Sequence, residues 1–406
     1  MGAGVLHNVS LSYQLLWNAQ RQLAGVELTL DAWPGCTLNA AHLLTTLSDL
    51  WGPQAPTLLL RTPSASLLTG LLDLTPPALA QVEIQADLLN DPAIAQRVQR
   101  AQQRGLQLVW RGESGQPLMP VFAACFSQGI VSLSTEDALM ALRVSRQLHT
   151  SNNRPILHSA RAVRAGQIYE GVASRALAEH CLDEQAAAAL LGWPVDDVLY
   201  SHRQARAQPS QHTIRRLVKA IEAEASMDDL ERLLGDEPLL AYHFLRYTNS
   251  AGLGLRHEID ALRQGLLVLG LSRTRTWLLE QLPHAIKDLN LQPVRQSMVL
   301  RAYLVTELLD VGDSEALKRE LYLCGLLSQI DVLLGESMSS ALRAIHLPSR
   351  VKVALLSQSG PYWPYLDLAM VVEAPFLEAT RERCSRHGFN PEDVNLALLR
   401  TLAVLK

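Results

Sequence analysis

The sequence predicts an α/β fold followed by an all-helical fold in one chain. Over the first half, short β-rich runs alternate with Ala- and Gln-rich helical stretches, which is the order of βαβ units whose parallel strands build a layered or barrel fold. Over the second half, apolar residues recur at the three-and-four spacing of amphipathic helices. A chain of 406 residues exceeds what a single core usually holds, so two domains are expected.

Five strands are predicted in the first half from short alternating or continuous apolar runs. They span residues 26–30, 57–60, 81–84, 106–110 and 129–133. Helices are expected between them, including one that Asp91 and Pro92 start and Gly105 ends. Another is expected over residues 135–149. Residues 186–191 are Ala-rich and are also predicted to be helical.

The helical half is organised around residues 236–270. Asp236 is predicted to cap a helix whose apolar face carries Phe244, because an aspartate before a proline commonly starts a helix. A second helix is expected over residues 259–270, and Ser272 is expected to cap a third. No carboxylate, thiol or imidazole cluster is expected here at catalytic spacing, so these helices are predicted to serve packing.

The rest of the second half has the same helical periodicity. Helices are predicted over residues 213–225, 297–311, 314–334, 337–346 and 348–357, and a last one begins at Asn390. The aromatic run 362–365 is predicted to be a loop that either binds a partner or plugs the edge of a core. Residues 201–212 are polar and are expected to connect the two domains, which we place at 1–203 and 204–406.

Composition excludes several classes of protein. Apolar residues make up 48% of the chain and charged residues 19%, a balance typical of a large buried core. No apolar run reaches the ~18 residues of a membrane-spanning helix, and the first residues lack the basic start of a signal peptide, so a cytoplasmic location is expected. The formal net charge of -4 argues against nucleic-acid binding. The widely separated cysteines are expected to be reduced thiols: Cys36, Cys125, Cys181, Cys324 and Cys384.

Several patterns in the second half resemble the HDOD domain. They are DEPLL at 236–240, LRYTNSA at 245–251, LGL at 269–271 and LCGLLSQID at 323–331. HDOD domains are metal-free relatives of the HD phosphohydrolases and occur in bacterial signalling proteins. The resemblance covers roughly half of the chain and implies an all-helical domain.

The first half resembles an EAL domain. Residues 13–31 are similar to the opening hairpin that leads into the Glu-Ala-Leu motif of that family, with Glu27 at its glutamate. Glu83 lies where the family has a second glutamate on a strand, and Ala178-Glu179 resembles its Ala-Glu pair on a late strand. The resemblance implies a (β/α)8-type barrel, which in active members hydrolyses cyclic di-GMP with metal ions.

Most of the metal ligands that this resemblance implies are missing. Two divalent ions need several carboxylates that converge within a few Å. The family's adjacent aspartate pair is absent at residues 108–112, where Arg111 would bring a positive charge instead. Its asparagine is absent from a strand expected near residues 67–73, and its lysine is absent from residues 129–133. Residues 196–197 are both Asp where the family's last strand has Gln-Gly.

Glu27, Glu83 and Glu179 are therefore interpreted as vestigial positions of that site. No catalytic residue, cofactor or metal ion is expected, because three isolated glutamates could not hold two ions. No histidine is followed directly by Asp, as a metal-binding His-Asp pair would require: His243, His257, His284 and His346 are scattered. We expect His243 to be a core or rim residue.

These observations predict a signalling protein that is not an enzyme. The expected function is that of a catalytically inactive scaffold, which acts through other proteins in a pathway linked to cyclic di-GMP and possesses no nucleic-acid partner. A homo-oligomer is compatible with the sequence. The alternatives are a sensor that binds cyclic di-GMP without cleaving it and an enzyme, either a residual phosphodiesterase or a hydrolase that uses the HDOD cleft.

Overall fold

The computed structural model describes residues 4–33, 35–114, 118–150, 163–202, 208–253, 258–309, 314–373 and 377–405. The chain forms two compact units: Met1–Asp197 together with Val371–Lys406, and Val198–Met370. This division differs from the predicted domains 1–203 and 204–406, because the end of the chain returns to pack with the first unit. The predicted boundary itself falls in residues 203–207, outside the described part of the chain.

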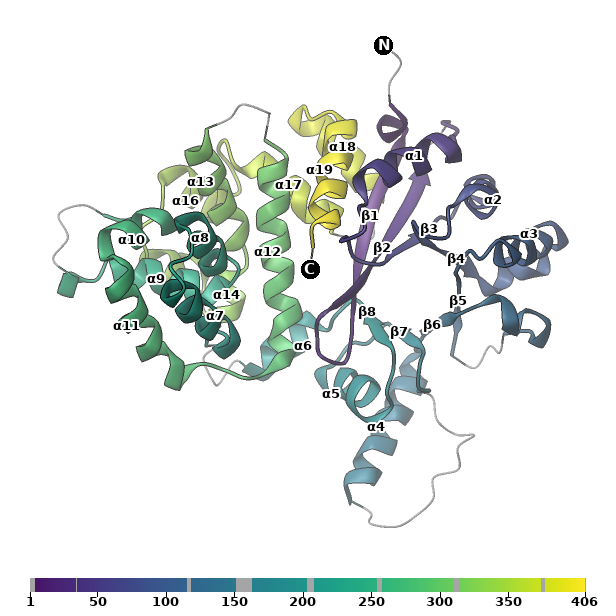
Figure 1. The fold of residues 1–406 in the computed structure, drawn as a ribbon, viewed down its shortest axis with the longest axis horizontal. Coiled ribbons are helices and arrows are strands. Elements are labelled where there is room, and N and C mark those ends of the chain that lie inside the picture. Colours follow the sequence, from purple (N-terminus) through teal and green to yellow (C-terminus); the bar gives the residue numbers. More distant parts are fainter. Residues whose placement is uncertain are drawn as a thin grey trace. The chain divides into compact units, whose positions relative to one another are not determined.

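The first unit is built on a closed barrel of eight strands in the order β1 to β8 (Figure 1). The strands are β1 (Val9–Trp17), β2 (Leu23–Ala32), β3 (Leu58–Arg61), β4 (Gln81–Gln85), β5 (Leu108–Glu113), β6 (Gln128–Ser132), β7 (Ile168–Glu170) and β8 (Ala189–Leu191). β1 pairs antiparallel with β2 and β8, and the remaining neighbours pair in parallel. The predicted barrel is confirmed, and the five predicted strands overlap β2 to β6.

Helices connect most of these strands. They are α1 (Ala40–Leu50), α2 (Ala65–Leu74), α3 (Pro92–Gln103), α4 (Thr135–Thr150) and α5 (Arg175–Glu179), with 3-10 turns η1 (Val5–Asn8), η2 (Ala86–Asn90) and η3 (Pro120–Cys125) and a π-helical segment, His180–Glu184. A further helix, α6 (Val195–His202), follows β8, and the division between the two units falls within it. The side chains of Asn39, Ser64 and Asp91 each accept a first-turn N–H of α1, α2 and α3. Local capping chemistry therefore sets where these helices begin.

Several predictions of secondary structure in this unit are wrong. Residues 186–191 are not helical, because Ala189–Leu191 forms β8, the strand that closes the barrel between β7 and β1. Pairing of β8 with β7 and β1 closes the barrel and outweighs the helical preference of the alanines in this stretch. Residues 67–73 lie on α2 instead of a strand, and the strand of this βα unit is β3, which ends at Arg61.

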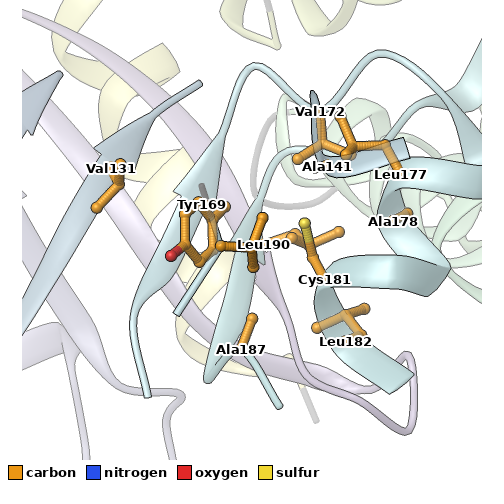
Figure 2. Close-up of a cluster of buried hydrophobic side chains, with 11 residues drawn as sticks. Val131, Ala141, Tyr169, Val172, Leu177, Ala178, Cys181, Leu182, Ala187 and Leu190 are labelled. Atoms are coloured by element: carbon orange, nitrogen blue, oxygen red, sulfur yellow. The ribbon is translucent and has the colours of Figure 1, made fainter. Parts of the chain in front are cut away.

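The strands alternate between an inner and an outer apolar face. One buried cluster inside the barrel contains Leu16, Leu59, Val109, Ile130, Ile168, Ala189 and Leu191. Figure 2 shows the other side of β6, β7 and β8, where Tyr169 and Leu190 pack against Cys181 and other residues of the following helices. Because successive side chains point to opposite faces, Tyr169 faces the helices while its neighbours Ile168 and Glu170 face inward.

The end of the chain packs against its beginning within the first unit. α18 (Leu377–His387) and α19 (Pro391–Ala403) lie beside η1 and the first strand (Figure 1). Asn395 on α19 is 2% exposed, and its Nδ2 donates to the carbonyl oxygens of Leu6 and Val9, both at 2.8 Å. Arg381 lies 4.5 Å from the centroid of the Trp33 ring, in the geometry of a cation–π contact. These contacts join the end of the chain to its beginning.

Replacing Asn395 with alanine is expected to lower the free energy of unfolding of the first unit by about 2 kcal/mol, because two buried carbonyl groups lose their donor. Urea unfolding monitored by circular dichroism measures the change. Arg400→Ala, on the exposed side of the same helix, is the matched control and should change the free energy by about 0.5 kcal/mol or less. Equal effects of the two substitutions would contradict the role given to Asn395.

The second unit is all-helical. Its elements are α7 (Gln211–Glu222), α8 (Met227–Gly235), α9 (Pro238–Thr248), α10 (Leu262–Leu269), α11 (Leu271–Gln281), α12 (Gln292–Glu307), α13 (Glu315–Leu326), α14 (Ile330–Leu334), α15 (Met338–Arg343), α16 (Ser349–Ser357) and most of α17 (Trp363–Val372), with 3-10 turns Ala251–Leu253, Leu282–His284 and Leu289–Leu291. Of the helices that the structure describes, none combines the length and the apolar character that a membrane crossing requires.

The helices predicted around residues 236–270 are present, but their caps differ from the prediction. Glu237, not Asp236, caps α9, since its side chain accepts a hydrogen bond from the N–H of Leu240 at 2.6 Å. Ser272 lies inside α11, whose N-cap is Gly270 with a φ of 75°. The reason is that glycine adopts this left-handed conformation without strain, so α11 can begin with a cap two residues earlier than expected.

The aromatic run at 362–365 begins in the core. Tyr362 is buried, and its hydroxyl donates a hydrogen bond to a carboxylate oxygen of Glu320 at 2.7 Å. Burial and this neighbouring carboxylate raise the pKa of Tyr362 well above its ordinary value. Residues from Trp363 onward form α17 instead of a loop. Tyr362 therefore lies in the core, whereas Trp363 and Tyr365 are only partly buried.

Candidate functional site

A layer of charged side chains lies above the inner apolar cluster of the barrel. Leu59, Ile130 and Ile168 face inward, so the residues two positions further along the same strands face inward as well. With the inward residues of β2, β4 and β5, these residues form what we call the ionic layer: Glu27, Arg61, Glu83, Arg111, Ser132 and Glu170. Six different strands, β2 to β7, each contribute one side chain.

Arg111 lies at the centre of the ionic layer and contacts all three carboxylates. Its Nε donates to Oε1 of Glu83 at 2.7 Å, and its Nη2 donates to Oε2 of Glu83 at 3.0 Å. The same Nη2 donates to Glu27, and Nη1 donates to Glu170. Arg111, Glu27 and Glu83 are all buried. The planar guanidinium therefore satisfies three acidic groups that have little access to water.

Arg61 and Ser132 make fewer or longer contacts in the layer than Arg111 does. Arg61 is 33% exposed, and its Nη1 lies 3.8 Å from Oε2 of Glu27, while its Nε lies 3.6 Å from Oε1 of Glu83. The hydroxyl of Ser132 donates to Oε1 of Glu170. Arg61, together with Glu170, which is 21% exposed, is thus where the ionic layer meets solvent.

The electrostatic balance of this layer involves a proton. Three carboxylates and two guanidinium groups leave one excess negative charge when all are ionised. Burial, together with the charge of Glu83, raises the pKa of Glu27 to about 8, although Arg111 and Arg61 act in the opposite direction. A proton on Glu27 at neutral pH makes the layer neutral, which is the state that a buried cluster favours.

Glu27 should make the stability of the barrel depend on pH. Its pKa is 4.5 in a solvated chain and about 8 in the fold, so the folded protein binds more protons than the unfolded protein between these values. Stability therefore falls as pH rises through this window, by at most about 1.4 kcal/mol per pH unit. Glu27→Gln should flatten the dependence, as measured by urea unfolding from pH about 5 to about 8. Glu179→Gln is the control, and a slope equally flat in both variants would contradict this assignment.

The residues present do not fit the metal ions that the EAL resemblance implies. Hard divalent cations require carboxylate oxygens that are free to coordinate. Oxygens of Glu27, Glu83 and Glu170 already accept hydrogen bonds from Arg111. Accordingly, the described residues contain no group of three or more His, Cys, Asp or Glu side chains arranged to hold a metal ion.

Two of the three predicted vestigial positions come together, and the third does not. Glu27 and Glu83 are neighbours in the ionic layer. Glu179 lies on α5 instead of a late strand, and its Oε1 accepts from Nε of Arg175 at 2.9 Å. Asp197 lies on α6 rather than on the last strand.

Sequence reasoning missed Glu170 and Arg61. Glu170 ends the short run Ile168–Glu170 directly before Gly171, which has a φ of 72°. A β-rich run that ends in a charged residue before glycine is the signal that could have located it. Arg61 ends the apolar run of β3 in the same manner. In this barrel, a charged residue at the end of an apolar strand therefore indicates a member of the ionic layer.

The histidines of the helical unit do not assemble into a site within the described residues. Burial, together with the charge of Arg246, lowers the pKa of His243 to about 4, so its imidazole is neutral at physiological pH. His346 pairs instead with Glu258. His257 lies outside the described residues. His243 is half-buried, in agreement with a position at the rim of the core.

A groove runs along α10 and α13 of the helical unit. A cavity of about 340 Å³ is bordered by α8, α10, α12 and α13, and a neighbouring cavity of about 300 Å³ shares Ala261, Arg319 and Leu323 with it. The floor is apolar or aromatic and includes Leu262, Tyr303, Tyr322 and Leu323. Leu267, which is 61% exposed, borders the second cavity. We refer to these two cavities, which share three lining residues, as the α10–α13 groove.

Ion pairs form the rim of the α10–α13 groove. Glu231 lies 3.3 Å from Nη1 of Arg263 and 3.2 Å from Nε of Arg319, and Lys318 lies 3.1 Å from Glu315. The groove therefore combines an apolar floor with a charged rim of both signs, which is the usual layout of a protein-binding surface.

The family comparison identifies this unit. Residues 208–347 match the family model of the HDOD domain. This part of the chain is an HDOD domain. The predicted HDOD fold is thus confirmed, and all the residues that border the α10–α13 groove belong to the HDOD domain.

Known proteins show further similarities. The cyclic di-GMP phosphodiesterase CdgJ of Vibrio cholerae is 26% identical over 170 residues, which cover 42% of this chain and 39% of that protein. The chain thus spans well under half the length of that relative. This comparison contradicts the expectation that the chain is not an enzyme, because the relative is named a phosphodiesterase. The expectation relied on the absence of the metal ligands that the EAL resemblance implies.

Three solved structures resemble parts of this chain. The MmoQ response regulator of Methylococcus capsulatus has a TM-score of 0.38 at 15% identity and covers 48% of this chain and 98% of its own. BlrP1 of Klebsiella pneumoniae, in complex with manganese and cyclic di-GMP, has a TM-score of 0.30 at 12% identity, covering 46% and 55%. A standalone EAL protein of Vibrio cholerae has a TM-score of 0.29 at 13% identity, covering 46% and 90%. Scores of this size carry no argument about activity.

Proposed function

We propose that this chain is a signalling protein of a cyclic di-GMP-linked pathway and that its HDOD domain binds a partner protein in the α10–α13 groove. The observation that carries the proposal is the groove itself, with its apolar floor and its rim of ion pairs. The link to cyclic di-GMP is supported by the name of the Vibrio cholerae relative. A formal net charge of -4 favours a protein over a nucleic acid as the partner.

The size and chemistry of the groove favour a protein segment over a small ion. Interfaces between proteins have an apolar centre and a polar edge, and a few buried apolar contacts supply most of the binding energy. Leu323 is buried on the groove floor, whereas Leu267 is exposed at its edge, where a partner can cover it. Removing Leu267 from water on binding would stabilise the complex by about 1.5 to 3 kcal/mol.

A paired substitution tests the proposal. Leu267→Glu places a charge at the edge of the groove, and Leu289→Glu places the same charge on an equally exposed leucine, 56% exposed, that does not border the groove. Proteins captured by the wild-type chain from its native cells are identified by mass spectrometry and then purified for binding titrations. We expect the dissociation constant of a specific partner to rise at least tenfold with Leu267→Glu only. Equal binding by both variants would exclude the groove.

Hydrolysis of cyclic di-GMP is a second candidate function, which the name of the relative favours. Purified chain is incubated with cyclic di-GMP and Mg²⁺ or Mn²⁺, and the linear dinucleotide is separated by chromatography. Turnover that Glu83→Gln abolishes would locate the reaction in the ionic layer. Binding without turnover, detected by calorimetry, would instead assign the chain as a sensor of the nucleotide.

A further inference from the structure

We propose that Arg111 is the built-in cation of the barrel and that Arg111 and a divalent metal ion are mutually exclusive occupants of the ionic layer. The EAL resemblance implies a barrel that holds metal ions, but the side chains of this chain do not fit such ions. Arg111 is the residue chiefly responsible. The proposal concerns the barrel alone and does not depend on partner binding by the HDOD domain.

The contacts of Arg111 use the oxygens that a metal ion would need. Its Nε and Nη2 engage both oxygens of Glu83, and its other contacts reach one oxygen each of Glu27 and Glu170. The second oxygen of Glu170 accepts the hydroxyl of Ser132. A divalent cation takes about six oxygen ligands, so it could enter only after the guanidinium had left these carboxylates.

Charge balance leads to the same conclusion. A divalent ion added to the layer would lie beside the guanidinium groups of Arg111 and Arg61, whose positive charges already balance two of the three carboxylates. Repulsion between such charges is strong because little water screens them at this depth. Without Arg111, three ionised carboxylates and Arg61 carry a net charge of -2, which one divalent ion neutralises. Removal of a single side chain therefore converts the layer from one that repels a metal ion to one that attracts it.

The proposal is tested by calorimetric titration of Mn²⁺ into the wild-type chain and into Arg111→Ala. We expect no heat of binding for the wild type at millimolar Mn²⁺. The Arg111→Ala variant should bind about one equivalent of Mn²⁺, with an affinity at least tenfold higher than that of the wild type. Adding Glu83→Gln to Arg111→Ala should abolish this binding. The control is Arg97→Ala, which removes an arginine from an exposed pair with Asp73 and should behave as the wild type.

Thermal unfolding provides the second measurement, since loss of Arg111 destabilises the barrel. Mn²⁺ should raise the midpoint of Arg111→Ala in proportion to its binding and leave the wild-type midpoint unchanged. The proposal would be overturned if the wild type bound Mn²⁺ as tightly as the variant does and if Glu83→Gln abolished that binding. A folded variant that binds no Mn²⁺ would overturn it too. So would a variant that remains unfolded in millimolar Mn²⁺, because the ion should then replace the missing charge.

Discussion

Replacing Arg111 with alanine is expected to destabilise the barrel unit by about 3 to 5 kcal/mol at neutral pH in the absence of divalent metal ions. The substitution leaves Glu27 and Glu83 buried with only the distant contacts of Arg61 as compensation. The loss should be smaller at low pH, because protonated carboxyl groups no longer require a counter-charge. Denaturant unfolding, with hydrogen exchange and mass spectrometry to separate the two units, measures the effect.

An exposed ion pair in the same unit supplies the comparison. Arg97 pairs with Asp73, and both side chains are substantially exposed. Pairs of this kind contribute about 0 to 1 kcal/mol, since water screens them in the folded state. Arg97→Ala should therefore have a small effect at every pH. If Arg111→Ala lowered the free energy of unfolding no more than Arg97→Ala does, the ionic layer would not be what stabilises the barrel.

In the HDOD domain, Arg295→Ala is expected to lower the stability of the helical unit by about 3 to 5 kcal/mol. Nε of Arg295 lies 2.9 Å from Oε1 of Glu237, and both side chains are buried. Glu237 caps α9 and also accepts the N–H of Ser210 at 3.2 Å, while Nη2 of Arg295 donates to the carbonyl oxygen of Gln208 at 2.6 Å. The pair thus joins α9 and α12 to the segment that precedes α7.

The matched control for Arg295 is Arg275→Ala. Arg275 pairs with Glu222 at 2.6 Å, but both groups are largely exposed. Its loss should cost about 1 kcal/mol or less. The double variant Arg295→Met with Glu237→Gln should recover part of the lost stability, because it leaves no buried charge unpaired. Hydrogen exchange of α9 and α12 would measure both effects, and an unperturbed α9 in Arg295→Ala would contradict this account.

Much of the local structure follows from short-range patterns. Asp91 and Pro92 start α3 as predicted, and Asn390 caps α19. Leu59 and Val109 belong to strands that apolar runs identify. Such patterns work because capping and side-chain alternation depend only on residues a few positions apart.

The ionic layer could be predicted only in part. The sequence alone indicates that Glu27, Glu83 and Arg111 end up near one another, because the resemblance assigns all three to strands of one barrel. Glu170 is marked in the sequence only by its place at the end of a short β-rich run before Gly171, and the stretch before that run offers no clear periodicity. Glu179 was assigned to the layer on the pattern Ala-Glu alone, and it pairs instead with Arg175 four residues earlier on the same helix.

The sequence by itself determined the alternation of strands and helices in the first half, the all-helical HDOD domain and the presence of Arg111 where acidic ligands were expected. The tertiary structure alone decided that Glu170 and Arg61 join the layer, that Ala189–Leu191 is a strand and that α19 returns to the start of the chain. The physical reason is that barrel closure brings together strand ends that are far apart in sequence, so inter-strand pairing overrides local preference.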